Sequence, residues 1–122
     1  MTPFADSSEL IRRIESAAKE HHQLLAIMKL HRGYAELRKF ADEIAKRING
    51  EIIRSVYTPN SELLLFEIRR KGLALVLLIV KSDTEEIVAV EQISNHEIAE
   101  IEANIYSSNI NDIYIRLVSD IF

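Results

Sequence analysis

The sequence predicts an α+β domain, with α/β-like alternation, in which two N-terminal helices precede a mixed sheet of four to five strands and a helix near the C-terminus. Two stretches with apolar residues at helical spacing, followed by four short segments of β-branched and aliphatic residues between turn clusters, lead to this prediction. The expected element order is ααββββαβ. A length of 122 residues, of which 48% are hydrophobic, fits a single domain with one core. We expect a helical extension at residues 1–31 and an αβ core at 32–122.

The first helix is expected to start at a capping box formed by Asp6-Ser7-Ser8-Glu9, in which a short side chain with an oxygen is followed three residues later by Glu9. Residues suited to a core then recur at alternating steps of four and three, which places them on one stripe of a helix. These residues are Leu10, Ile14, Ala17, His21, Leu24 and Met28. The spacing predicts that this helix ends near Lys29.

A second helix is expected beyond Gly33, on a stripe formed by Tyr34, Leu37, Ala41, Ile44 and Ile48. The step from Met28 to Leu37 is about half a turn out of phase with the first stripe, at 3.6 residues per turn. The chain therefore has to break near Gly33 if both stripes are to reach one core. Asn49-Gly50 then supplies a left-handed cap at the C-terminus of the helix.

Four strands follow, separated by clusters of turn residues. They are expected at 51–57, 62–70, 73–81 and 86–92, with turns at 58–61, 71–72 and 82–84. Residues 73–81 are apolar on both faces, which indicates a central strand covered on both sides. A second capping box at Ser94–Glu97 predicts a helix to about Tyr106. The tail at 112–118 fits a helical stripe but is also rich in strand formers, and a strand is preferred there.

Composition limits the compartment and the chemistry of the protein. The chain has no cysteine, which excludes disulfides, thiolate metal sites and a cysteine nucleophile. Its N-terminus has no basic region followed by an apolar run, so no signal peptide is expected. The longest apolar run, Leu73–Val80, is too short for a membrane helix, which needs roughly 20 residues. We expect a cytoplasmic protein that has no membrane partner.

The net charge of −4 is distributed unevenly along the chain. Residues 1–82 hold 14 of the 15 Lys/Arg and 10 of the 19 Asp/Glu, a balance of +4. Residues 83–122 hold one basic residue, Arg116, and nine acidic ones, a balance of −8. This asymmetry indicates a basic face for an acidic partner, or a homo-oligomer that joins basic end to acidic end, or a solvated surface without a partner.

The usual catalytic and metal-binding motifs are absent from the sequence. It contains no G-x-S-x-G, P-loop, G-x-G-x-x-G or HExxH pattern. His21 and His22 are adjacent, so they point about 100° apart on a helix, and His31 lies off the face of His21. The spacing of His96 and Glu100 allows a pair, which is expected to be a surface contact. No complete active site and no bound metal are predicted from these residues.

A basic cluster is expected where the second predicted strand meets its turn. Arg69, Arg70 and Lys71 are consecutive, and Arg54 is expected on the neighbouring strand. Such a cluster suits contact with phosphate groups. It equally suits a charged edge that blocks aggregation between strands.

Residues 32–118 resemble the core of PD-(D/E)xK nucleases, and in particular the archaeal Holliday-junction resolvases. The matching features are Arg32-Gly33 opening a helix with Glu36, the first strand at 50–55, and Leu78–Ser82 closing the third strand. In the family, acidic residues hold a divalent metal and a nearby lysine activates or orients water. The resemblance therefore implies a site at the end of the third strand.

The family's metal site is incomplete in this chain. In Ile79-Val80-Lys81 the lysine is present, but Ile79 stands where the family has an acid, and a hard cation requires oxygen ligands. Glu62 is the nearest candidate for the acid of the middle strand, and Glu36 comes one residue earlier than the family's helix glutamate. The resemblance thus implies a degenerate active site with no cofactor. Mg²⁺ would be expected only if Glu36, Glu62 or Glu67 substituted for the missing ligands.

Three functions follow from these observations. The first is a non-catalytic, nuclease-fold-like protein that acts as a nucleic-acid-associated or structural subunit on duplex or branched nucleic acid. Its phosphate contacts would be Arg54, Arg69, Arg70, Lys71 and Lys81. The alternative is a small acidic interaction module, of the immunity or adaptor type, that binds a basic protein partner. The third is a metal-dependent nuclease that uses Glu36, Glu62 and Lys81.

Overall fold

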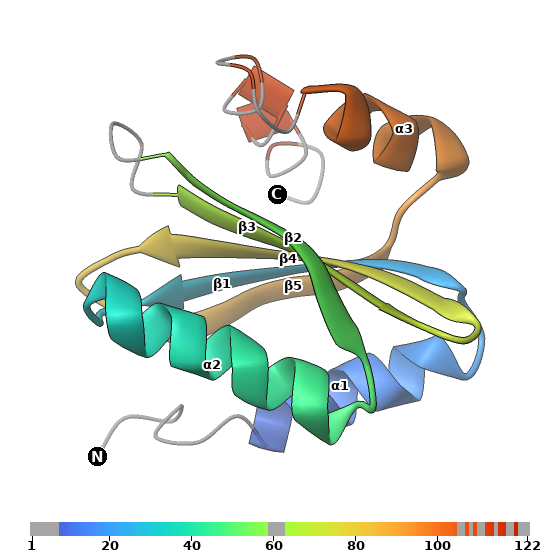
Figure 1. Cartoon of the computed structure of the whole chain (residues 1–122), viewed down its shortest axis with the longest axis horizontal. Coiled ribbons are helices and arrows are strands. Elements are labelled where there is room, and N and C mark those ends of the chain that lie inside the picture. Colours follow the sequence, from blue (N-terminus) through green and yellow to red (C-terminus); the bar gives the residue numbers. More distant parts are fainter. Residues whose placement is uncertain are drawn as a thin grey trace.

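A computed structural model describes residues 8–58 and 63–104, together with the single positions 107, 109, 112, 113, 115, 116 and 119. The elements are α1 (Ser8–Ala18), β1 (Gln23–Leu30), α2 (Tyr34–Arg47), β2 (Glu51–Thr58), β3 (Leu63–Arg70), β4 (Leu73–Lys81), β5 (Glu86–Gln92) and α3 (Asn95–Asn104) (Figure 1). The α+β class is confirmed. The strands form one mixed five-stranded sheet in the order β2-β3-β4-β1-β5.

Residues 23–30 form the strand β1, and the prediction of one helix to Lys29 is wrong. The two N-terminal helices are thus separated by a strand, and the expected helical extension at 1–31 contains part of the sheet. β1 is parallel to β4 and antiparallel to β5. All residues from Leu24 to Met28 are buried. Because an apolar run that fills both faces of a strand also contains a helical stripe, periodicity alone does not distinguish the two.

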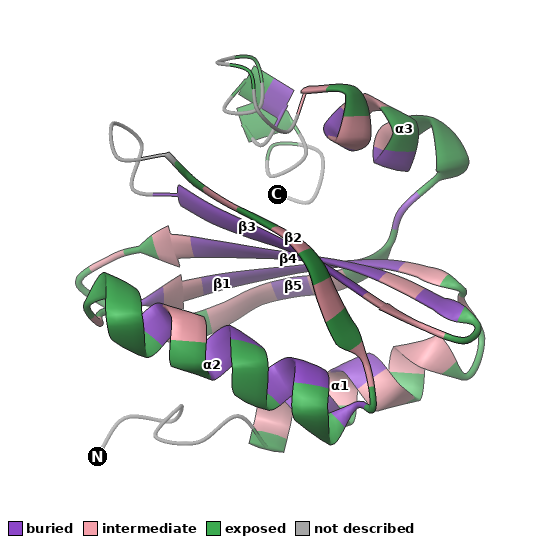
Figure 2. Cartoon of the chain, viewed as in Figure 1, coloured by how far each residue is buried: buried purple, intermediate pink, exposed green. Residues whose placement is uncertain are grey.

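The sheet has a helical layer on each side (Figures 1 and 2). α1 and α2 cover one side, called here the α1/α2 face, and pack against alternate strand residues such as Leu24, Met28 and Phe66. α3 covers the other side, the α3 face, whose core includes Ile27 and Leu65. Two apolar clusters therefore stabilise the protein, one on each side of the sheet.

The predicted C-terminal cap of α2 and the predicted capping box at the start of α3 are confirmed, whereas the predicted end of α3 near Tyr106 lies outside the described residues. Asn49 has a φ of 59°, and its N–H and that of Gly50 donate to the carbonyls of Lys46 and Ala45, at 3.1 and 2.7 Å. These are the two hydrogen bonds of a Schellman motif. At the start of α3, the Ser94 hydroxyl accepts from the Glu97 N–H at 3.1 Å, and a Glu97 carboxylate oxygen accepts from the Ser94 N–H at 3.0 Å.

The four predicted strands after α2 are confirmed with small shifts at their ends. β4 is buried on both faces along most of its length, as expected for a central strand. β3 and β4 form a hairpin across Lys71-Gly72, where Gly72 adopts a φ of 80°, a conformation that residues other than glycine rarely take. Asp6 and Ser7 of the predicted capping box and residues 59–61 of the predicted turn at 58–61 lie outside the described residues.

The predicted strand at 112–118 is wrong where the structure describes it. Asp112, Ile113, Ile115, Arg116 and Ser119 have helical conformation. Ile113 is buried in the core of the α3 face, whereas Ile115 is 54% exposed. In a strand these two side chains would point to the same face, so the burial pattern excludes a period of two.

None of the described helices is both long and apolar enough to cross a lipid bilayer.

Candidate functional site at the carboxyl ends of β1 and β4

The predicted basic cluster does not form one surface. Arg54 and Arg69 project on the α3 face, where Arg54 contacts Glu67 on β3 at 3.0 Å and Arg69 contacts Glu102 on α3 at 3.2 Å. Arg70 projects on the opposite face and contacts Glu15 of α1 at 2.7 Å. Three of the five expected phosphate contacts are therefore ion-paired within the protein.

The two lysines of that predicted set lie at opposite ends of the sheet. Lys71 is in the turn before β4, and Lys81 is the last residue of β4. At about 3.3 Å per residue, roughly 30 Å separates them. Both side chains are exposed, and neither makes an ion pair with the part of the chain that the structure describes. They cannot contact the same phosphate group.

Many of the charged residues behind the asymmetry of the sequence form ion pairs within the fold. Nine of the 15 Lys/Arg form ion pairs with described acidic residues. Two of these pairs join the basic part of the chain to the acidic part at the start of β5, namely Lys29–Glu86 at 3.4 Å and Arg32–Glu85 at 3.2 Å. The ion pairs thus hold the C-terminal third against the rest of the molecule.

One hollowed region lies where the carboxyl ends of β1 and β4 meet the start of α2. Two hollows of about 340 and 400 Å³ share His31 and Lys81. The region, called here the carboxyl-end site, is lined by His31, Arg32, Gly33, Glu36, Lys81, Ser82 and Asp83. In open sheets with parallel strands, ligands commonly bind outside the carboxyl ends of the strands.

The parallel pairing of β1 and β4 builds this site. Leu30 and Lys81 are opposite each other in the ladder, so both strands end at the same edge of the sheet. The Ser82 N–H donates to the Leu30 carbonyl at 3.0 Å, which extends the pairing by one residue. Nδ1 of His31 lies 3.1 Å from the Ser82 carbonyl oxygen. With the proton on Nδ1, this bond orients the ring and leaves Nε2 as an acceptor.

The first turn of α2 adds backbone donors to the site. Gly33 is the N-cap and contributes no side-chain hydrogen bond to the helix. The N–H groups of the first helical turn lack intrahelical partners, and they carry a partial positive charge. Glu36 in that turn and Asp83 after β4 place carboxylates around the same region. The site therefore combines donors for an anion with two groups that repel one.

The structure brings together only part of the predicted catalytic set. Glu36 and Lys81 line the same hollow. Glu62 lies outside the described residues, and Glu67 is buried on the α3 face beside Arg54. Ile79 is fully buried in the core of the α1/α2 face. Among the residues that are described, no group of three His, Asp or Glu side chains is placed to hold a metal ion.

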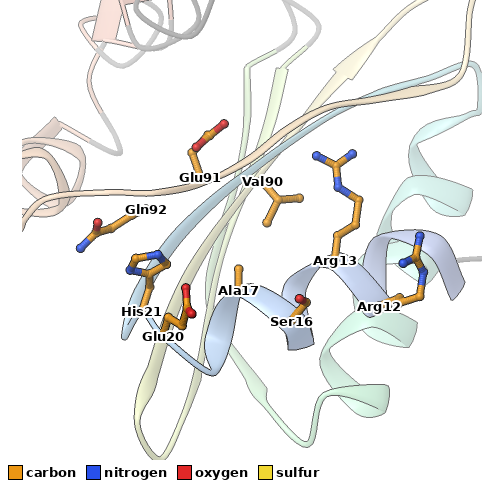
Figure 3. A pocket seen from close by; sticks show the side chains of 9 residues that line it. All are labelled: Arg12, Arg13, Ser16, Ala17, Glu20, His21, Val90, Glu91 and Gln92. Atoms are coloured by element: carbon orange, nitrogen blue, oxygen red, sulfur yellow. The ribbon is translucent and has the colours of Figure 1, made fainter.

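A separate hollow, of about 360 Å³, lies between α1 and β5 and is shown in Figure 3. Its lining carries charged groups of both signs, namely Arg12, Arg13, Glu20 and Glu91, and Figure 3 shows His21 beside Glu20. The sequence did not predict it, because it depends on how α1 packs beside an edge strand. His22 lies against the turn between β3 and β4, where its Nδ1 is 3.1 Å from the Gly72 carbonyl oxygen.

Comparison with protein families, with curated proteins and with solved structures finds no match for this chain.

Proposed function

We propose that the protein is a non-catalytic, nucleic-acid-associated protein that holds a phosphate group at the carboxyl-end site. The observation that carries this proposal is the position of Lys81. Its side chain is exposed, has no ion-pair partner among the described residues, and lines one hollow with His31 and the start of α2. An ammonium group beside free helix N–H groups suits a phosphate oxygen.

Binding is favoured over cleavage by the surroundings of Lys81. Metal-dependent cleavage needs several oxygen ligands around the ion. Of the predicted acids that the structure describes, Glu36 lines the hollow with Lys81 and Glu67 does not, and the acid position of the resemblance is taken by the buried Ile79. The resemblance to the nucleases remains a prediction, and it enters the proposal only as a reason to expect nucleic acid.

The proposed contact with phosphate involves few charged groups. Lys81 supplies charge for about one phosphate, so the logarithm of the affinity should fall with the logarithm of the salt concentration with a slope of about −1. Glu36 and Asp83 limit the affinity further. Weak, salt-sensitive binding is therefore the expected behaviour.

Fluorescence anisotropy with labelled oligonucleotides at low salt tests the proposal. Lys81→Ala should weaken binding at least severalfold and lower the salt slope by about 1. Lys71→Ala is the matched control, because Lys71 is an exposed lysine in the turn that precedes the same strand, at the opposite end from Lys81. No binding at low salt, or an equal effect of the two variants, would contradict the proposal.

The interaction module that binds a basic protein is less well supported. Four of the nine acidic residues in 83–122 pair with arginine or lysine of the same chain, so they are not free for a partner. These residues are Glu85, Glu86, Glu100 and Glu102. Glu97 is engaged in the capping box of α3.

A further inference from the structure

Two exposed tyrosines lie next to the carboxyl-end site. Tyr34 is the first residue of α2 and is 50% exposed, and Tyr57 near the end of β2 is 40% exposed. Their ring centroids are 5.0 Å apart, with the planes inclined at 53°. The rings contact each other and still leave much of their surface to solvent. The sequence did not predict this pair, since the two residues are far apart in the chain.

The ladder positions place the pair on the same side and at the same end of the sheet as Lys81. Tyr57 is paired with Leu64, and Leu64 with Ile79, two residues before Lys81. Side chains two residues apart on a strand share a face. At about 4.8 Å per strand and 3.3 Å per residue, Tyr57 and Lys81 are roughly 12 Å apart. Tyr34 directly follows Gly33, which lines the site. Neighbouring nucleotides of one strand can reach both features.

The charges of the described residues favour a single strand over a duplex as the occupant. A duplex is held mainly through many phosphate contacts. Only six of the 15 Lys/Arg lack an ion pair in the described part of the chain, and Lys81 is the one that lines this site. Single strands gain much of their binding from stacking of bases on aromatic rings, which requires little charge. In a duplex the base faces are already stacked and do not reach the tyrosines.

We infer that the carboxyl-end site and the Tyr34–Tyr57 pair form one binding surface for single-stranded nucleic acid, with phosphate beside Lys81 and an unstacked base on the tyrosine rings. This inference rests on the proposed function and narrows it to single strands. Glu36 lies at the same edge of the sheet, and its negative charge repels phosphate. Charge alone therefore does not hold a ligand here, which makes the surface selective for ligands that also stack on the tyrosines.

Anisotropy titrations with a labelled 12-nucleotide single strand and with its duplex test the inference at low salt. The single strand should bind at least fivefold more tightly than the duplex. Tyr57→Ala and Tyr34→Ala should each weaken single-strand binding by about tenfold, and Tyr57→Phe should retain it, because the phenyl ring preserves stacking. Ile53→Ala is the matched control, since Ile53 is 46% exposed on the same strand and is expected to leave binding unchanged.

The outcomes separate this inference from the proposed function. If Lys81→Ala weakens binding while the tyrosine variants do not, or if the duplex binds as tightly, the tyrosine surface is refuted and phosphate binding stands. If neither nucleic acid binds, both fail. Tyrosine-dependent capture of a protein in the absence of oligonucleotide binding would likewise overturn both. Thermal melting of each alanine variant shows that it is folded. If an alanine variant is not folded, Tyr57→Leu, which keeps an apolar side chain but has no aromatic ring, should weaken single-strand binding in its place.

Discussion

Nε of Arg54 lies 3.0 Å from a carboxylate oxygen of Glu67, across the ladder between β2 and β3, and Glu67 has no exposed surface. Nη2 of Arg69 lies 3.6 Å from the other oxygen and 3.2 Å from Glu102 on α3. Glu67 is thus a buried negative charge held by two arginines, and one of these also joins β3 to α3. Two of the arginines that the sequence assigned to phosphate contact are therefore engaged in ion pairs within the fold.

Glu67→Gln should destabilise the protein. The change leaves Arg54 and Arg69 next to each other without the charge that holds them. Removal of one partner of a buried pair costs about 3–5 kcal/mol. Because the arginine side chains are 35% and 28% exposed, we expect the lower end of that range. The free energy of unfolding from urea titration measures the effect.

The double variant Glu67→Leu with Arg54→Met is the control for Glu67→Gln. Replacing a buried pair by apolar residues of similar size is often neutral or stabilising. The double variant should therefore recover much of the loss. A Glu67→Gln protein as stable as the original chain would show that the ion pair contributes nothing.

Replacing Ile27 and Met28 one at a time by alanine tests whether residues 23–30 form a central strand. Both side chains are fully buried, on opposite faces of the sheet. Each variant should lose about 2–5 kcal/mol of unfolding free energy. A helix with its stripe at Leu24 and Met28 would expose Ile27 and make its replacement nearly neutral. Lys29→Ala is the control, with an expected loss below about 1 kcal/mol, since the side chain is part-exposed and forms a surface pair.

Gly50→Ala should strain the junction between α2 and β2. A Cβ at this position would lie 2.9 Å from Cγ2 of Ile68 and 3.3 Å from the Arg69 carbonyl oxygen. Overpacking of this kind costs about 1–3 kcal/mol. At Gly33 an added Cβ meets nothing within 4 Å, so Gly33→Ala should change the melting temperature little by comparison. Equal melting temperatures for the two variants would refute the close contact.

Ser94→Ala should weaken the start of α3. The change removes the hydroxyl that accepts the Glu97 N–H, and a lost N-cap costs about 1 kcal/mol. Hydrogen exchange at the first-turn amides of α3 should accelerate. Ser16→Ala, an exposed serine within α1, should be neutral or slightly stabilising, because alanine has the higher helix propensity.

Glu36→Gln distinguishes binding from metal-dependent cleavage. If the carboxyl-end site holds a phosphate, removing the Glu36 charge removes a repulsion and should tighten oligonucleotide binding by about twofold to fivefold. If the protein is instead a nuclease, the same change removes a metal ligand. Cleavage of junction DNA with Mg²⁺ or Mn²⁺ that is lost in both Glu36→Gln and Lys81→Ala would favour the nuclease.

Elements with local signals were predictable from the sequence. The cap at Asn49-Gly50, the reversal at Lys71-Gly72 and the capping box at Ser94–Glu97 each depend on residues within a few positions of one another. The central position of β4 also followed, because an apolar run with charged residues at its borders fits a strand covered on both faces. Of the residues that line the candidate site, only Glu36 and Lys81 were predicted from the sequence as site residues.

The strand β1 and the ion-pair partners of the arginines were not predictable from the sequence. Leu24–Met28 combines good helix formers with burial on both faces, and only pairing with β4 and β5 decides between the two conformations. Arg54, Arg69 and Arg70 look like free basic residues until the sheet places Glu67, Glu102 and Glu15 beside them. The Tyr34–Tyr57 contact likewise joins residues that no local pattern connects.

By itself, the sequence determined the class of the fold, the C-terminus of α2, the start of α3, the strands from β2 to β5, and the lack of any cysteine chemistry. These depend on backbone preferences and on periodic burial, which act over a few neighbouring residues. Only the tertiary structure decided that 23–30 is a strand, that most of the arginines form ion pairs, and that His31, Lys81 and two tyrosines lie at the same end of the sheet. Those features depend on contacts between residues far apart in the chain, whose free energy exceeds the small local preferences that the sequence displays.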